Sequence, residues 1–237
     1  MGKVRTLLDA VDALGFDELG RSSEGRPIRG HRFGGAATGR ALLVMGGIHG
    51  DEPASVEAVT ALAARMLARA RTGPADLPAP VWVLPAANPD GVARGSKNSA
   101  RDVDLNRNFP ARSFTTDHRP GYFPGPAPLS EPETELLAAL IARAGVAAVV
   151  AVHAPFGCIN YDGPAAAWAE SVAAACGWPP QADIGYPTPG SLGNWLGVDR
   201  GLPVLTLELP DRELGLHAAR AAAALDEAVR TVPVYTA

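Results

Sequence analysis

Residues 41–53 read Ala-Leu-Leu-Val-Met-Gly-Gly-Ile-His-Gly-Asp-Glu-Pro. The unbroken apolar run has the length of a buried strand, and the glycine pair that follows would end it. Pro53 then stands where a helix begins, because the first turn of a helix has no acceptor for the N–H that proline lacks. The stretch therefore predicts a buried strand that leads directly into a helix, which is the building unit of an α/β sheet.

Apolar runs alternate with longer Ala/Leu-rich segments of helical period along the whole chain. Strands are expected at residues 28–33, 41–45, 81–84, 146–152 and 204–207, and helices at residues 53–71, 132–144, 164–176, 190–198 and 215–230. This alternation predicts an α/β sheet sandwiched by helices. Residues 88–130 have little periodicity, and a connection of that length inside a compact domain is usually functional.

Composition and charge narrow the class of protein. A chain of 237 residues with 47% hydrophobic and 19% charged residues suits one globular domain over residues 1–237, with an Ala-rich core. The net charge of −4 gives no basic field for nucleic acid or an anionic membrane. Acidic residues interrupt Met1–Gly20, where a signal peptide needs an apolar region, so we expect a cytoplasmic protein. Cys158 and Cys176 are too few for a disulfide framework.

Polar side chains follow three of the expected strands. His49 and Glu52 lie in the turn after residues 41–45, His153 follows residues 146–152, and Glu208 follows residues 204–207. In an open α/β sheet the ligand crevice lies beyond the carboxyl ends of the strands, so these side chains should meet at one edge. Imidazole and carboxylate bind Zn²⁺, and a catalytic zinc has three protein ligands and one open position. The alternatives are a chance His-x-x-Glu pair, a loop histidine and a surface glutamate.

A second group of polar residues lies in the long connection. Residues 104–108 read Asp-Leu-Asn-Arg-Asn. Asn106 and Arg107 together offer an amide and a planar guanidinium, which can bind a carboxylate through two hydrogen bonds. The alternative is a solvated loop arginine.

The chain resembles the zinc carboxypeptidase family, which includes carboxypeptidase A, in the order and spacing of its motifs. These motifs are His49-Gly-Asp-Glu52, Asn88-Pro-Asp-Gly91, Asp104-Leu-Asn-Arg-Asn-Phe-Pro110, His153 and Thr206-Leu-Glu208. Residues 20–28, 153–163 and 186–193 are similar to the small cytosolic branch called murein peptide amidase A. The resemblance covers about residues 20–210. It implies a three-layer α/β/α fold with a mixed, mostly parallel central sheet.

The resemblance also implies the roles of individual residues. One zinc ion would be held by His49, Glu52 and His153, and Glu208 would be the general base. Two further groups of residues would bind the substrate. The free carboxylate of the substrate would be bound by Arg107 with help from Asn106, and Tyr186 would close over the bound substrate.

Two positions depart from the family's pattern. Where members usually carry an arginine that polarises the scissile carbonyl, this chain has Lys97. Arg94 or Arg101 could supply that charge instead, and the sequence does not choose among the three. Asp51 stands where digestive carboxypeptidases carry an arginine, so a long peptide is a less expected substrate.

The reaction implied is hydrolysis of an amide whose amine belongs to an amino acid with a free carboxylate. The leading substrate is the γ-D-glutamyl–diaminopimelate bond of murein tripeptide, in peptidoglycan recycling. The alternatives are an N-acyl amino acid deacylase of the aspartoacylase or succinylglutamate desuccinylase kind, and a peptide-binding module without turnover. Asp162 and Asp183 are candidates for the distal ammonium of diaminopimelate, against the alternative of solvated loop acids. His31, His118 and His217 are expected to lie outside the metal site.

Overall fold

The computed structural model describes residues 2–34, 40–73 and 77–233. Its strands form an eight-stranded sheet in the order β1-β2-β4-β3-β5-β8-β6-β7. The strands are β1 (Asp17–Arg21), β2 (Pro27–Phe33), β3 (Ala41–Met45), β4 (Val81–Leu84), β5 (Val146–His153), β6 (Cys158–Asp162), β7 (Pro180–Gln181) and β8 (Val204–Glu208). The helices are α1 (Gly2–Asp12), α2 (Pro53–Thr72), α3 (Pro89–Arg94), α4 (Pro132–Arg143), α5 (Ala166–Cys176) and α6 (Ala218–Arg230). Short helical turns are η1 (Leu105–Arg107), η2 (Asn194–Val198) and η3 (Gly215–His217).

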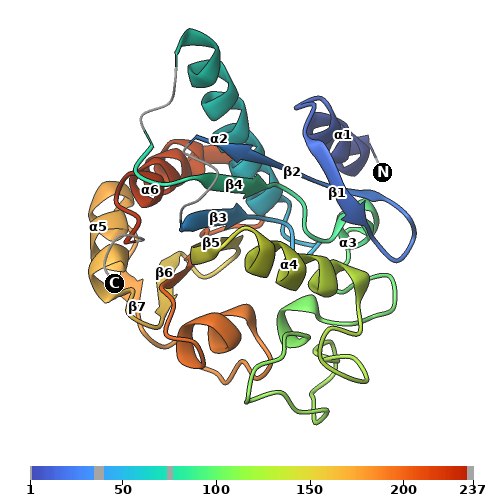
Figure 1. Cartoon of the computed structure of the whole chain (residues 1–237). Helices are drawn as coiled ribbons and strands as arrows, with labels where there is room; N and C mark the ends of the chain where they lie inside the picture. Colours follow the sequence, from blue (N-terminus) through green and yellow to red (C-terminus); the bar gives the residue numbers. More distant parts are fainter. Residues whose placement is uncertain (1, 35–39, 74–76, 234–237) are drawn as a thin grey trace.

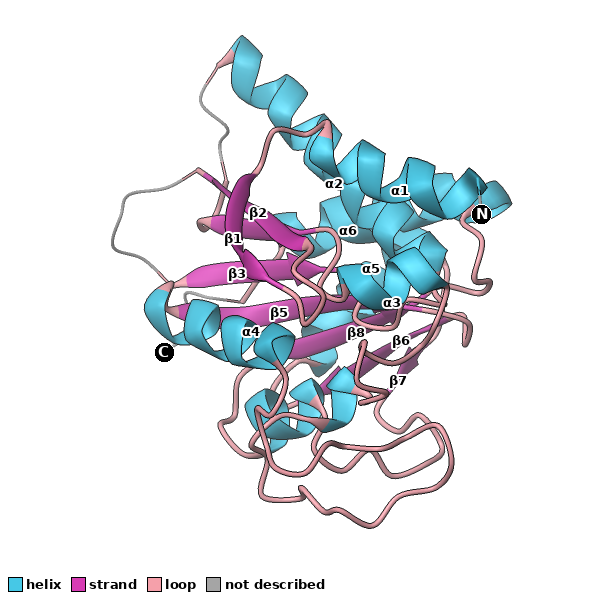
Figure 2. Cartoon of the chain, turned by 90° about the vertical axis from the view of Figure 1, so that its right-hand side faces the viewer, coloured by secondary structure: helices cyan, strands magenta, loops and turns pink. Residues whose placement is uncertain are grey.

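The middle of the sheet is parallel and its flanks are mixed. β3 runs parallel to β4 and β5, and β5 runs parallel to β8. The pairs β1–β2, β2–β4 and β6–β8 are antiparallel. Helices cover both faces of this sheet (Figures 1 and 2), so the predicted three-layer α/β/α fold with a mixed, mostly parallel sheet is confirmed.

Each face of the sheet has its own hydrophobic core, because neighbouring side chains of a strand point to opposite faces. Leu42 and Val44 of β3 belong to the core shared with α2, α5 and α6. Leu43 and Met45 belong to the core shared with α4 and the long loops. Ala151 of β5 lies in this second core, so His153, two residues further on, lies on the same face. We call the face of the sheet that is covered by α4 and the long loops the loop face. The polar residues at the ends of the central strands lie on this face.

Two long segments close the loop face. Figure 1 shows residues 95–130 (green) and 183–203 (orange) together beneath the sheet, and the backbone N–H of Phe109 donates to the carbonyl of Gly190 at 2.9 Å. The connection after α3 is therefore held against residues 183–203 by a backbone hydrogen bond.

The five expected strands are all present, with ends that differ by one residue or none. The helices expected at residues 53–71, 132–144 and 164–176 are also confirmed as α2, α4 and α5. The helix expected at residues 190–198 begins only at residue 192, and its π-helical part is η2. Residues 215–230 divide into η3 and α6. The elements that the sequence did not predict are α1, α3, η1, β1, β6 and β7.

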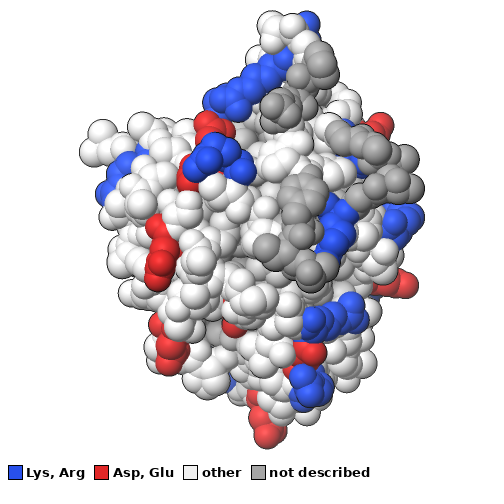
Figure 3. Space-filling model, turned by 60° about the vertical axis from the view of Figure 1, so that its left-hand side comes forward, with Lys and Arg blue, Asp and Glu red and all other residues white. Residues whose placement is uncertain are grey.

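The described residues contain no helix with the length and hydropathy needed to span a bilayer. On the face drawn in Figure 3, basic and acidic side chains are interspersed, and neither sign gathers into a large patch. Cys158 and Cys176 are both free and buried, as expected of small core thiols.

Candidate metal centre

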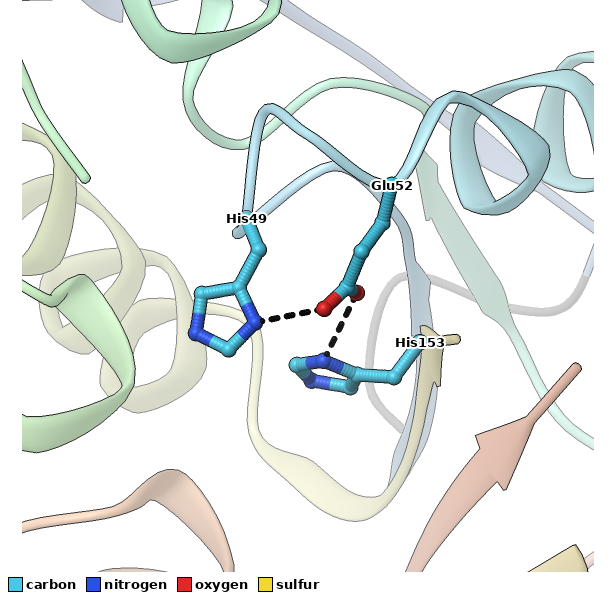
Figure 4. Close-up of side chains that lie close together, drawn as sticks. All are labelled: His49, Glu52 and His153. Carbon is cyan, nitrogen blue, oxygen red and sulfur yellow. Dashed lines mark hydrogen bonds and ion pairs between the residues drawn. The ribbon is translucent and has the colours of Figure 1, made fainter. Parts of the chain in front are cut away.

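Three side chains from distant parts of the chain point toward one another at the end of the parallel strands (Figure 4). His49 lies in the turn after β3, Glu52 directly precedes α2, and His153 is the last residue of β5. One ligand atom of each lies within 4.8 Å of the others, and all three residues are buried. Gly50 allows this tight turn, since a Cβ there would overlap the backbone of Gly91 in α3.

The carboxylate of Glu52 joins the two imidazole rings. Its Oε1 lies 2.9 Å from Nδ1 of His49, and its Oε2 lies 3.1 Å from Nδ1 of His153. Burial alone would raise the pKa of Glu52, but the two histidines outweigh it and hold that pKa well below its usual range. The carboxylate is therefore charged, and two nitrogens and one oxygen face a common point, which is the His₂Glu donor set of a catalytic zinc site.

Asp104 fixes the orientation of His49. Its Oδ1 lies 3.0 Å from Nε2 of His49, and its side chain is fully buried. Burial lowers the pKa of His49, but Glu52 and Asp104 outweigh it and raise that pKa to about 10. A metal-binding histidine commonly donates its second N–H to a carboxylate, which fixes the tautomer that presents the other nitrogen to the metal. In the sequence, Asp104 stands out only as the first residue of a motif, and nothing local reveals this role.

Glu208 lies beside this group without belonging to it. It is the last residue of β8 and pairs in register with His153 of β5, so the two side chains stand next to each other on one face. Its Oε2 is buried and has no hydrogen-bond partner among the described residues. Burial and the charge of Glu52 raise the pKa of Glu208 to about 7, although His153 and the N–H of Phe156 lower it. Such a carboxyl group can accept and release a proton near neutral pH.

The structure brings all the predicted site residues into one pocket. The pocket encloses about 860 Å³, open space at its mouth included. Its lining includes His49, Glu52, Lys97, Asn106, Arg107, His153, Tyr186 and Glu208. No other group of three or more possible ligand residues is found among the described residues, and His31, His118 and His217 lie outside this one, as expected.

Arg107 is a buried cation in this pocket. No carboxylate of the described residues lies within ion-pair distance of its guanidinium, one nitrogen of which donates to the carbonyl of Asn106 at 2.7 Å. The side chain of Asn106 is held in place because its Oδ1 accepts from the N–H of Leu192 at 3.0 Å. Burial raises the pKa of Tyr186 and neighbouring Arg107 lowers it in part, so the phenol stays protonated beside the guanidinium. The pair Asn106–Arg107 is thus placed to receive an anionic group.

Of the three cations that the sequence left open, Lys97 alone lines the pocket. Its ammonium contacts Asp104 and lies 3.6 Å from the ring centroid of Tyr122. Arg94 instead forms an ion pair with Glu24. Arg101 forms an ion pair with the buried carboxylate of Glu131, with 3.9 Å between Nη1 and Oε1.

Asp51 has a partner that the sequence did not reveal. Its carboxylate forms an ion pair with Arg212, which lines the same pocket. Arg212 therefore places a cation beside position 51, where the sequence suggested that one is missing. The carboxylate of Asp51 balances the charge of Arg212.

Comparisons with known proteins agree with this geometry. The sequence model of a family described as zinc carboxypeptidase matches residues 11–171. Murein peptide amidase A of Escherichia coli strain K12 is 34% identical over 208 residues, which cover 83% of this chain and 81% of that protein. The enzyme of the same name from Vibrio campbellii is 33% identical over 181 residues, covering 71% of this chain and 68% of that protein.

Solved structures give the same answer for the fold. The crystal structure of murein-tripeptide amidase MpaA from Escherichia coli O157 superposes with a TM-score of 0.71 at 32% identity, covering 90% of this chain and 89% of that one. Bovine thrombin-activatable fibrinolysis inhibitor superposes with a TM-score of 0.74 at 16% identity, covering 95% of both chains. The second likeness concerns the fold alone.

Proposed function

The chain belongs to the zinc carboxypeptidase family, and from this premise we propose that it is a zinc-dependent amidase acting on murein tripeptide. The bond cleaved is the amide between γ-D-glutamate and diaminopimelate, which releases an amino acid with a free carboxylate. The observation that carries this proposal is the meeting of the His49–Glu52–His153 group, Glu208 and Arg107 in one pocket. Relatives named as murein peptide amidases match most of the chain, which supports the substrate.

The metal would be held by His49, Glu52 and His153. When bound, zinc supplies Lewis-acid chemistry to this site. Glu208 accepts a proton from the attacking water and later donates it to the leaving amine. A pKa of about 7 suits both transfers, because the group is then neither a strong acid nor a strong base at cellular pH.

Three other residues orient the substrate. Arg107 and Asn106 bind the free carboxylate of the leaving amino acid, since a planar guanidinium with an adjacent amide matches the two carboxylate oxygens. Tyr186, whose phenol lies at the same pocket, covers the bound substrate and excludes water.

Lys97 is proposed as the cation that stabilises the negative charge developing on the scissile carbonyl. We expect Lys97→Ala to lower kcat by about 10²- to 10³-fold, the usual effect of removing a group that stabilises an oxyanion. Arg94→Ala is the matched control, because it also removes one positive charge but breaks only the ion pair with Glu24, away from the pocket. Equal losses in both variants, or a normal kcat in Lys97→Ala with unchanged zinc content, would contradict this role.

A direct assay tests the proposed function. Zinc-loaded protein is incubated with L-Ala-γ-D-Glu-meso-diaminopimelate, and free diaminopimelate is measured by mass spectrometry. We expect release from this tripeptide and much slower release from an α-linked C-terminal dipeptide, from acetylaspartate and from succinylglutamate. Faster turnover of acetylaspartate or succinylglutamate would favour a deacylase, and zinc binding without hydrolysis of any amide would favour a peptide-binding module.

The proposal extends to the bounds of the catalytic domain and to the compartment in which the protein acts. We propose a single catalytic domain over residues 1–237, since the metal-binding group draws residues from both halves of one sheet. We also propose that the protein acts in the cytoplasm, in the recycling of peptidoglycan peptides. Two free, buried cysteines are compatible with a reducing compartment.

A further inference from the structure

The ammonium group of Lys97 is held at the pocket by three groups at once. It contacts the carboxylate of Asp104, and it donates to the carbonyl of Gly121 at 3.1 Å. It also lies 3.6 Å from the ring centroid of Tyr122, within the range of a cation–π contact. An ammonium group has three N–H donors, and the carboxylate and the carbonyl take two of them. The attraction of the ring depends on the charge of the ammonium group, so the third donor can still turn to a substrate carbonyl in the pocket.

A tight turn over residues 119–122 presents both the carbonyl and the ring. Its sequence is Arg-Pro-Gly-Tyr, and the N–H of Tyr122 donates to the carbonyl of Arg119 at 3.1 Å. Proline at the second position and a glycine with a φ of 80° at the third are typical of a type II turn. The N–H of Asp104 donates to the carbonyl of Phe123 at 2.7 Å, which ties the end of the turn to Asp104. The three groups around the ammonium group therefore form one connected unit.

Lysine is a rare residue in this chain. Of its 21 lysines and arginines, only Lys3 and Lys97 are lysines. A guanidinium is broad and planar, whereas an ammonium group is compact and can meet a carboxylate, a carbonyl and a ring around one nitrogen atom. The surroundings of Lys97 therefore match lysine rather than arginine.

Building on the proposed function and the role of Lys97 in it, we propose that Tyr122 is a positioning residue for the reaction. The face of its ring holds the ammonium group of Lys97 beside the carbonyl that is cleaved. The same ring centroid lies 4.0 Å from the guanidinium carbon of Arg119 and 5.4 Å from that of Arg107, so the contact with Lys97 is the shortest of the three. Among the described residues the hydroxyl of Tyr122 forms no hydrogen bond, so the ring carries the effect.

Two substitutions at Tyr122 separate the ring from the hydroxyl. We expect Tyr122→Leu to lower kcat on murein tripeptide by about 3- to 30-fold, the usual strength of a cation–π contact, and Tyr122→Phe to keep most of the activity. KM should change little, because Lys97 acts on charge that develops only in the transition state. A higher KM with a normal kcat would mean that Tyr122 acts through Arg107, which binds a carboxylate already present in the substrate, and would overturn the proposal. Equal losses in the two variants would also overturn it.

Phe123→Leu is the matched control. It makes the same change from an aromatic residue to leucine one position further on, where Phe123 lies against the ring of His118 and does not line the pocket. We expect this variant to keep a normal kcat. In a Lys97→Ala background, Tyr122→Leu should lower kcat little further, because the ring then has no ammonium group to hold. A loss in Phe123→Leu equal to that in Tyr122→Leu, or an effect of Tyr122→Leu that is the same with and without Lys97, would contradict the assignment.

A measurement without substrate tests the contact itself. Because the chain has two lysines, protein labelled with ¹³C-lysine gives two sets of ε-CH₂ signals, and Lys97→Ala identifies the set of Lys97. We expect the ring current of Tyr122 to shift these protons upfield in the zinc-loaded protein. Tyr122→Phe should keep the shift and Tyr122→Leu should abolish it. If zinc-loaded wild-type protein does not hydrolyse murein tripeptide, the proposed function fails and the role of Tyr122 fails with it, whereas an unshifted Lys97 signal in an active protein removes only the role of Tyr122.

Discussion

Glu208→Gln is expected to lower kcat by about 10²- to 10⁴-fold, the range typical of a lost general base. Glutamine has the same shape as glutamate but cannot take a proton from water, so the substitution removes the chemistry and keeps the packing. Because Glu208 lies outside the metal-binding group, the zinc content should not change. Steady-state kinetics on murein tripeptide and metal analysis by mass spectrometry measure the two quantities separately.

Glu133→Gln controls for the loss of a buried carboxyl group as such. Glu133 is fully buried in α4, and its pKa is raised by burial like that of Glu208, but it does not line the pocket. We expect kcat of this variant to stay close to that of the wild-type protein. The general-base assignment would be wrong if Glu208→Gln retained most of the activity, and Glu208 would be a ligand if the variant lost its zinc.

The pH profile of the wild-type protein follows from the same residue. Glu208 acts as a base only when it is ionised, so kcat/KM should fall as the pH drops through its pKa. Burial raises that pKa to about 7, and a bound cation nearby would lower it. The acid limb of the profile is therefore expected at or below about pH 7, and it should be absent from the residual activity of Glu208→Gln.

That His153 and Glu208 meet at one edge of the sheet could be predicted because local sequence and a general rule agree, whereas the zinc-ligand and general-base roles came from the family resemblance. Apolar runs that end at His153 and Glu208 are visible in the sequence, and parallel strands bring their carboxyl ends to one edge. The register confirms the convergence, since the two residues pair directly between β5 and β8. His49 and Glu52 lie in the turn after β3, so their exact positions depend on that turn.

Other parts depend on contacts that no local pattern encodes. The residues of β6 do not form a continuous apolar run, and Asp162 reaches the pocket only because β6 returns antiparallel to β8. The choice among Lys97, Arg94 and Arg101 likewise depends on which side chain meets Asp104, and the sequence shows only three cations close together. The wrong start of the helix expected at residues 190–198 has a similar cause, since the loop there bonds to Asn106 and Phe109.

His49→Ala is expected to weaken zinc binding by more than about 100-fold and to abolish hydrolysis. The variant leaves two of the three proposed ligands, and even the loss of a residue that only orients a ligand lowers metal affinity by about 10- to 100-fold. His217→Ala is the matched control, because His217 pairs with Asp211 outside the metal-binding group. Zinc per chain is measured by mass spectrometry after dialysis. A full complement of zinc in His49→Ala would remove His49 from the ligand set.

Asp104→Asn separates ligation from orientation. Asp104 contacts Nε2 of His49 and not the other ligands, so this variant should bind zinc about 10- to 100-fold more weakly but still bind it. Because Asp104 acts through His49, the two effects should not add: in a His49→Ala background, Asp104→Asn should change zinc affinity little further. Additive losses across this double-mutant cycle would mean that Asp104 supports the metal by a route independent of His49, such as its contact with Lys97.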